Sequence, residues 1–184
     1  MLPTIALVGR PNVGKSTLFN KLTNSRDALV ADVPGLTRDR RYGRMEVEEG
    51  QVTLIDTGGL FGEHILADEL TGQTQLAVDE ADLVLLILDG REGVTAADED
   101  VVTYLRKSNV AFLPVINKID GLNEDQIIAD FVRFGFPAYA MISASHNRVL
   151  KQLRETIAKR LADLNMVLNP APAEEPDGIR VAVV

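Results

Sequence analysis

The sequence predicts an α/β fold with a mostly parallel six-stranded sheet and one antiparallel edge strand, and three observations support this prediction. Short apolar runs of strand length alternate along the 184 residues with stretches that carry apolar residues at helical spacing. A glycine turn joins two neighbouring strand-like segments, which is typical of an antiparallel hairpin. Polar or glycine-rich motifs follow several of the strands, where sheets of this class bind their ligands.

The expected strands are short apolar runs, typical of strands buried on both faces, together with a hairpin that turns at Glu49-Gly50. In chain order they are Thr4–Val8, Arg41–Glu48, Gln51–Ile55, Leu83–Leu88, Val110–Ile116 and Ala138–Ile142. Apolar residues at helical spacing predict helices over 16–22, 96–107, 123–134 and 148–165. Residues 26–39, which include the turn signal Pro34-Gly35, and residues 60–70 are irregular.

The composition is that of a globular protein, with 46% hydrophobic and 25% charged residues. The absence of cysteine excludes a disulfide scaffold, a thiolate zinc site, an iron–sulfur cluster and a cysteine nucleophile. The net charge of −8 argues against direct nucleic-acid binding by this chain, and a basic cluster at 38–44 is interpreted as a solvated face. No apolar run is long enough to span a membrane and no leader is recognisable, so a cytoplasmic protein without a membrane partner is expected.

The chain is expected to contain one complete domain and the beginning of another. Residues 1–164 form the predicted domain, residues 165–178 a proline-rich acidic linker, and residues 179–184 the first strand of a second, truncated domain. Val181–Val184 repeats the apolar pattern of Ile5–Val8, which indicates that a second copy of the first strand begins there. An unrelated apolar tail is the alternative.

Residues 9–16, Gly-Arg-Pro-Asn-Val-Gly-Lys-Ser, match the Walker A phosphate-binding pattern between an expected strand and an expected helix. Glycines let the backbone turn its N–H groups toward phosphate oxygens, and the helix presents its positive N-terminal end to the same anion. Lys15 is expected to reach the β- and γ-phosphates, and Ser16 to bind Mg²⁺. The residues expected to contact phosphate are Gly9, Asn12, Val13, Gly14, Lys15, Ser16 and Thr17.

Asp56-Thr57-Gly58-Gly59 follows the third expected strand. A carboxylate at this place suits Mg²⁺, and Gly59 has no Cβ, so its amide can approach a γ-phosphate closely. Thr37, in the irregular stretch 26–39, would join Mg²⁺ if that loop folds over the γ-phosphate. An ordinary Asp–Gly turn and an exposed threonine are the alternatives.

Asn117-Lys118-Ile119-Asp120 follows the fifth expected strand, and its residue types suit guanine. Asp120 can accept from the ring N–H and the exocyclic amine, Asn117 can donate to the purine, and Lys118 can lay its stem along the base. Adenine lacks that donor pair, whereas an ordinary polar turn would show no base preference. The Ser-Ala pair after the last strand would support this loop and offer an amide to the guanine carbonyl. The residues expected to contact guanine are Asn117, Lys118, Asp120, Ser143 and Ala144.

In order and spacing these motifs resemble a Ras-like GTPase domain, with Gly9–Leu18, Pro34–Asp39, Asp56–Gly59, Asn117–Asp120 and Ser143-Ala144 as the matching stretches. Within that superfamily the chain is similar to the Era-related branch, and the repeated strand after the acidic linker is similar to members with two GTPase domains in tandem. The resemblance implies a P-loop, Ras-like three-layer sandwich that binds GTP and GDP with Mg²⁺ and hydrolyses GTP as a molecular switch. It also implies a bacterial protein that acts in assembly of the large ribosomal subunit. The ribosomal contact would then belong to a second GTPase domain and a KH-like domain outside this chain.

The resemblance also implies a mechanism. It assigns catalytic roles to Lys15, Thr37, Gly59 and Asn12, and Mg²⁺ to Ser16, Thr37 and Asp56. In relatives an asparagine at the place of Asn12 is associated with K⁺, so a K⁺ ion that neutralises charge between the phosphates is expected there. Leu60 stands where Ras-type enzymes place a water-orienting glutamine, which predicts slow hydrolysis without a side-chain base at that position. Arg91 and the acidic stretch Asp98–Asp100 are expected at the surface.

Two other functions remain open. One is a nucleotide-sensing regulatory module with negligible turnover, which shares every binding motif and differs only in a turnover assay. The other is an ATP-dependent P-loop enzyme, against which the Asn117–Asp120 motif argues.

Overall fold

The apolar runs form the strands of one sheet in the computed structural model, which describes residues 2–23, 28–29, 41–48, 50–57, 67–143 and 147–168. From one edge to the other the strands are β2 (Ala28–Leu29), β3 (Arg41–Val47), β4 (Gly50–Asp56), β1 (Thr4–Val8), β5 (Leu83–Asp89), β6 (Phe112–Asn117) and β7 (Ala140–Met141). β4, β1, β5, β6 and β7 are parallel, whereas β3 runs antiparallel to β4 and to β2. The expected mostly parallel sheet with an antiparallel edge is confirmed, and the two-residue β2 extends that edge.

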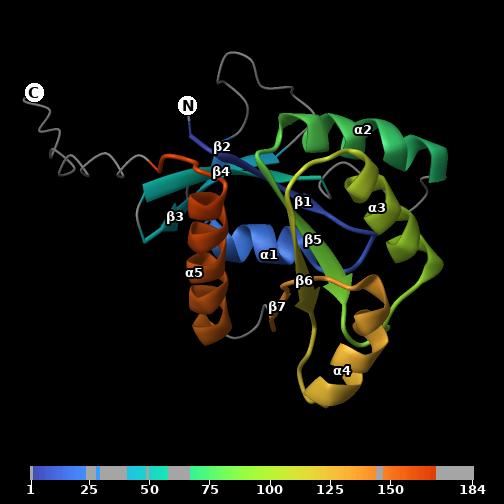
Figure 1. Cartoon of the computed structure of the whole chain (residues 1–184). Helices are drawn as coiled ribbons and strands as arrows, with labels where there is room; N and C mark the ends of the chain where they lie inside the picture. The colour runs from blue at the N-terminus through green and yellow to red at the C-terminus, as the bar shows by residue number, and fades with distance from the viewer. Residues whose placement is uncertain are drawn as a thin grey trace, which may run out of the picture.

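Helices cover both faces of the sheet, which gives the three layers of an α/β sandwich (Figure 1). They are α1 (Lys15–Leu22), α2 (Ala67–Glu80), α3 (Ala96–Lys107), α4 (Glu124–Phe131) and α5 (Asn147–Asp163), with a 3₁₀ turn η1 (Val132–Phe134) after α4. α1 and α5 pack on one face, and α2, α3 and α4 pack on the other. Within the described ranges, none of these helices combines the length and apolarity needed to cross a bilayer.

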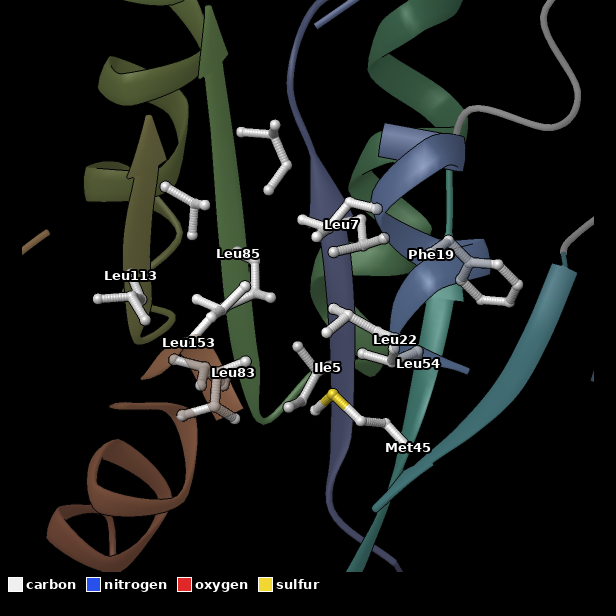
Figure 2. Close-up of a cluster of buried hydrophobic side chains, with 14 of the residues drawn as sticks. Ile5, Leu7, Phe19, Leu22, Met45, Leu54, Leu83, Leu85, Leu113 and Leu153 are labelled. Atoms are coloured by element: carbon white, nitrogen blue, oxygen red, sulfur yellow. The ribbon is translucent and has the colours of Figure 1, made fainter. Parts of the chain in front are cut away.

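Alternation of side chains along the strands builds a separate core on each face. Ile5 and Leu7 of β1 point to the face of α1 and α5, where they join the cluster shown in Figure 2. Ala6 and Val8 point to the opposite face and pack with residues of α2, α3 and α4. Every residue of β5 is buried, because this central strand has neighbours on both sides and helices above and below. The continuous apolar run of its sequence follows from that position.

Besides the added β2, and η1 at the end of the helix expected over 123–134, α2 and β7 differ from the sequence-based prediction. α2 was not expected, and among its described side chains Ala77 and Val78 are the buried apolar ones, which is too few for a clear helical pattern. β7 was expected over 138–142 and pairs with β6 only at Ala140 and Met141. The two residues before it, at 138–139, are exposed at the edge of the sheet. Burial of apolar side chains therefore does not favour a strand there.

The domain boundaries proposed from the sequence stay predictions. Met166 and Leu168, at the start of the expected linker 165–178, pack against the core on the face of α1 and α5. The rest of that linker and the expected strand 179–184 lie outside the described residues.

The register of the sheet brings the polar residues at the carboxyl ends of the parallel strands close together. Leu7 of β1 lies opposite Asp56 of β4, and Asp89 of β5 lies opposite Asn117 of β6. Because these strands are parallel, the segments that follow them leave the sheet side by side.

Candidate functional site: a phosphate loop joined to a purine-binding segment

The loop between β1 and α1 leaves the first turn of α1 open to an anion. Gly14 is the N-cap residue, with φ of 100°, and no side chain caps the helix. By contrast, Thr95 and Asn123 cap α3 and α4 with side-chain oxygens, and acidic residues occupy the first turns of both helices. The first turn of α1 has no acidic residue, so none of its own side chains neutralises the positive end of the helix. This is the arrangement that binds phosphate.

Lys15 lies folded onto this loop. Its side chain is largely buried, and its Nζ donates hydrogen bonds to the carbonyl oxygens of Gly9, at 2.7 Å, and Arg10, at 2.8 Å. Burial lowers the pKa of Lys15 to about 8, because desolvation outweighs the attraction of Asp56, and the positive charge of Arg10 acts in the same direction as burial. Phosphate oxygens would replace the two carbonyls and stabilise the charged amine.

Asp56 and Ser16 fit a Mg²⁺ ion that also has phosphate ligands. The Asp56 side chain, at the end of β4, is fully buried and acts electrostatically on Lys15. Carboxylate and hydroxyl oxygens are the hard ligands that Mg²⁺ prefers. The described residues contain no group of three or more acidic or histidine side chains that would hold a metal ion alone. Mg²⁺ in proteins commonly binds one or two carboxylates together with phosphate oxygens and water, and Asp56 and Ser16 suit that kind of site.

The segment expected to bind a purine, Asn117–Asp120, is fastened to residues 9–16, the expected phosphate loop. Asn117 is buried, and its Nδ2 donates to the carbonyl oxygen of Val13 at 2.9 Å. A Cβ on Gly14 would lie 2.4 Å from the same Nδ2, so glycine is needed for this close approach. Ser143 donates through its hydroxyl to the carboxylate of Asp120, which fixes the acid proposed to recognise the base.

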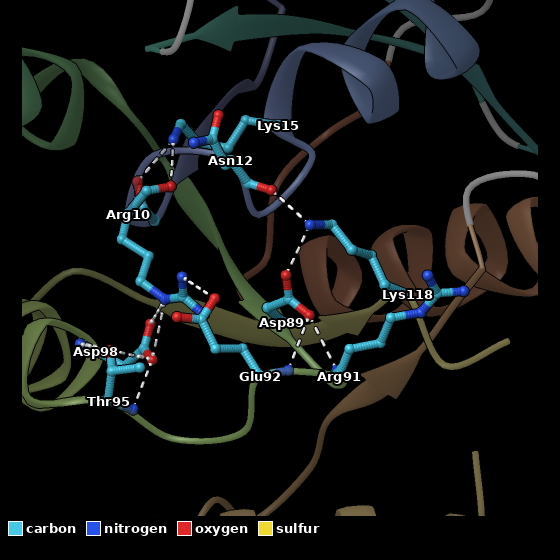
Figure 3. A network of polar contacts seen from close by, with 10 residues as sticks. Arg10, Asn12, Lys15, Asp89, Arg91, Glu92, Thr95, Asp98 and Lys118 are labelled. Atoms are coloured by element: carbon cyan, nitrogen blue, oxygen red, sulfur yellow. Dashed lines mark hydrogen bonds and ion pairs between the residues drawn. The ribbon is translucent and has the colours of Figure 1, made fainter. Parts of the chain in front are cut away.

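Lys118 bridges the two segments. Its Nζ donates to the carbonyl oxygen of Asn12 at 2.6 Å and to the carboxylate of Asp89 at 2.7 Å (Figure 3). Asn12 and Lys118 both have a φ of 63°, a left-handed conformation that is uncommon for residues other than glycine and that Asn109 and Asn165 also adopt. The structure thus brings together the described members of the two predicted motifs. Thr37, Gly59 and Ala144 lie outside the described residues.

Sequence reasoning placed Asp98 at the surface, and this prediction is wrong. Asp98 is 1% exposed, and its carboxylate accepts hydrogen bonds from the main-chain N–H of Thr95, at 2.9 Å, and from Arg10, at 3.3 Å. The spacing Thr95-x-x-Asp98 is that of a capping box, a signal that predicts the helix start but not the contact with Arg10. Arg91, also expected at the surface, is exposed.

The comparisons with known proteins agree with this geometry. A family model described as "50S ribosome-binding GTPase" matches residues 4–118. GTPase Der of Thioalkalivibrio sulfidiphilus is 51% identical over 185 residues, an alignment that covers 100% of this chain and 39% of the relative. GTPase Der of a Marinomonas species is 49% identical, and the alignment covers 100% of this chain and 42% of that relative. The chain therefore spans about two fifths of the length of these curated relatives.

Solved structures of Era share the fold. The structure of Aquifex aeolicus Era bound to GDP and AlF4⁻ matches 92% of this chain and 58% of that one, with a TM-score of 0.68 and 25% identity. Era in complex with MgGDPNP and a segment of 16S ribosomal RNA matches 86% of this chain and 56% of that one, with a TM-score of 0.67 and 28% identity. Since the family model matches more than half of the sequence, the chain belongs to the family of 50S ribosome-binding GTPases.

Proposed function

We propose that this chain binds GTP and GDP with Mg²⁺ and hydrolyses GTP as a molecular switch. The observation that carries the proposal is the direct attachment of the Asn117–Asp120 segment to the phosphate loop, through the bond from Asn117 to Val13. This contact supports a polyphosphate site and a guanine site that lie side by side. The relatives named GTPase Der and the Era structures bound to guanine nucleotides support the same assignment.

Each residue has a role in this proposal. The N–H groups at the start of α1 and the amine of Lys15 hold the phosphates, while Ser16 and Asp56 hold Mg²⁺, which would neutralise charge on the phosphate oxygens. Asn117, Lys118 and Asp120 would bind guanine, Ser143 would support the loop, and the main-chain amide of Ala144 would face the guanine carbonyl. Thr37 and Gly59 would sense the γ-phosphate and order residues 30–39 and 58–74.

The ribosomal role is part of the proposal as well. This chain covers about two fifths of the length of its relatives. The remaining length leaves room for the second GTPase domain and the KH-like domain that the resemblance implies. The family description supports an action in assembly of the large ribosomal subunit. The Era complex, which contains RNA of the small subunit, supports only a general link to ribosomal RNA. We place this action in the cytoplasm. The ribosomal contact would lie in the domains outside this chain.

Calorimetry with GDP, GTP and ATP, followed by measurement of phosphate release, tests the proposal. We expect binding of both guanine nucleotides, little binding of ATP, and slow Mg²⁺-dependent release of phosphate. Tight ATP binding would favour an ATP-dependent P-loop enzyme instead. Guanine-nucleotide binding without turnover in either Na⁺ or K⁺ would favour a nucleotide-sensing module.

Potassium is expected to accelerate hydrolysis. Asn12 is exposed at the rim of the loop, where its side chain is accessible to an ion beside the phosphates. A cation there would stabilise charge that develops in the transition state, so phosphate release should be about tenfold faster or more in KCl than in NaCl. The Asn12→Ala variant should lose this difference. Equal rates of the unmodified chain in both salts would exclude the ion.

Nucleotide affinity is expected to fall as pH rises through the pKa of Lys15, about 8 in the nucleotide-free protein. Phosphate favours the charged amine, so its pKa is higher in the complex than in the free protein. Above the free pKa, binding must therefore take up a proton, and the GDP dissociation constant should rise by up to about tenfold per pH unit. Titration calorimetry between about pH 7 and about pH 9 measures this slope. Lys15→Arg should remove the slope, and a flat profile of the unmodified chain would contradict the assignment.

A further inference from the structure

Asp89, at the end of β5, is a buried carboxylate that neither nucleotide motif includes. Its side chain accepts a hydrogen bond from Lys118 Nζ at 2.7 Å, and bonds from the main-chain N–H groups of Arg91, at 2.9 Å, and Glu92, at 3.3 Å. Burial acts to raise the pKa of Asp89, but the hydrogen bond from Lys118 and those from the two N–H groups together hold it below its usual range. Asp89 is therefore an ionised group that joins Lys118 to the loop after β5.

The same loop holds the other side of the phosphate loop. Arg10 donates to Glu92 at 2.7 Å and to Asp98 at 3.3 Å, and its guanidinium is mostly buried. Because Asp89 accepts from the N–H of Glu92, it also fixes the turn that presents Glu92 to Arg10. Figure 3 shows these contacts as one network.

The contacts therefore fasten the phosphate loop at two points on either side of Pro11. Arg10 is tied to Glu92 and Asp98, and the carbonyl of Asn12 is tied to Lys118, which Asp89 holds. Both ties depend on the stretch from Asp89 to Asp98.

We propose that Asp89 is a positioning residue for nucleotide binding. Asp89 holds Lys118 across the phosphate loop, and it also holds the turn that places Glu92 against Arg10. The base-binding segment and the phosphate loop therefore form one unit. This proposal rests on the proposed binding of guanine nucleotides. Asp89 does not touch the nucleotide in it; Lys118 and the loop do. Losing the charge of Asp89 should free Lys118 and loosen the phosphate loop together, although the two lie on different segments.

The Asp89→Asn variant tests this, because asparagine keeps the shape and one oxygen for the two N–H groups but loses the charge that attracts Lys118. We expect dissociation of GDP to become about tenfold to hundredfold faster, and KM for GTP to rise by a similar factor while kcat changes little. A purely structural loss would lower the melting temperature and the active fraction without moving KM.

Asp82→Asn is the matched control, because Asp82 accepts a main-chain hydrogen bond from Thr4, at 2.8 Å, just before the opposite end of β5. It makes the same change of charge and should leave GDP dissociation and KM unchanged. A double-mutant cycle sharpens the test: in a Lys118→Met background, Asp89→Asn should have little further effect on dissociation.

The outcomes separate the two proposals. If the unmodified chain binds no GDP, both proposals fall. If it binds GDP but Asp89→Asn dissociates at the unmodified rate, or if the effects of Asp89→Asn and Lys118→Met simply add, the positioning role is overturned while the proposed function stands.

Discussion

Replacing Asp120 by asparagine is expected to change the preferred nucleotide from GDP to xanthosine diphosphate (XDP). In the proposed site the carboxylate would accept hydrogen bonds from two N–H donors of guanine, whereas xanthine has a carbonyl in place of the exocyclic amine. The amide of asparagine can donate to that carbonyl but leaves a guanine donor without an acceptor. Buried sites of this kind discriminate by up to about 10⁴–10⁵, so the ratio of the two affinities should shift by about a thousandfold or more. Competition of XDP and GDP against a fluorescent nucleotide measures the ratio.

Asp120→Asn is a conservative change, because the side chain of asparagine can still accept the hydrogen bond from Ser143. Removing that bond with Ser143→Ala provides the comparison. It should weaken GDP binding by up to about tenfold without creating a preference for xanthine. An unchanged preference in Asp120→Asn would show that this carboxylate does not face the base, and the assignment of the purine site would fail.

Replacing Gly14 by alanine is expected to remove most of the nucleotide affinity. The added Cβ would lie 2.4 Å from Asn117 Nδ2, and a φ of 100° is strained for any residue with a side chain. Relief of the clash must move Asn117 away from Val13 or shift the first N–H groups of α1. Either movement separates the two halves of the site, so GDP should bind about a hundredfold more weakly or worse.

Gly135→Ala separates this effect from the general cost of a left-handed backbone. Gly135 has a φ of 59°, and a Cβ there would meet no atom within 4 Å. This variant should lose about 1 kcal/mol of folding stability and keep its GDP affinity. Calorimetry of both variants, with thermal melts to confirm folding, makes the comparison. Similar affinities in the two would show that the contact between Gly14 and Asn117 is not required.

Much of the fold was predictable because its strands are buried on both faces. The run Thr4–Val8 coincides with β1, and the helical pattern 96–107 coincides with α3. In both elements the apolar residues follow the geometry of the backbone closely. α2 was missed because its described part buries few apolar side chains. The length of the last strand was overestimated, because residues 138–139 at the exposed edge of the sheet do not pair with β6.

The candidate site was predictable only as far as its chemistry is local in sequence. The phosphate loop and the guanine motif are short continuous stretches, so their function can be predicted from neighbouring residue types alone. The contact of Arg10 with Asp98 joins residues 88 positions apart, and that of Lys118 with Asp89 joins residues 29 apart. Such pairs form only when particular strands lie next to each other in the sheet. The order of the strands in the sheet could not be predicted from the composition or the spacing of residues. An acidic residue on a helix therefore looked like a solvated one.

Because no side chain caps the first turn of α1, an anion that binds there supplies hydrogen-bond acceptors that the helix itself lacks. In α3 and α4 side-chain oxygens accept hydrogen bonds from the first N–H groups, whereas in α1 a bound anion would do so. Binding of an anion to the loop would therefore raise the free energy of unfolding. At a ligand concentration of one hundred times the dissociation constant this linkage amounts to about 2.7 kcal/mol. The durability of the protein in a cell would then follow the size of the guanine-nucleotide pool, and inorganic phosphate or sulfate in a storage buffer would act as a partial substitute.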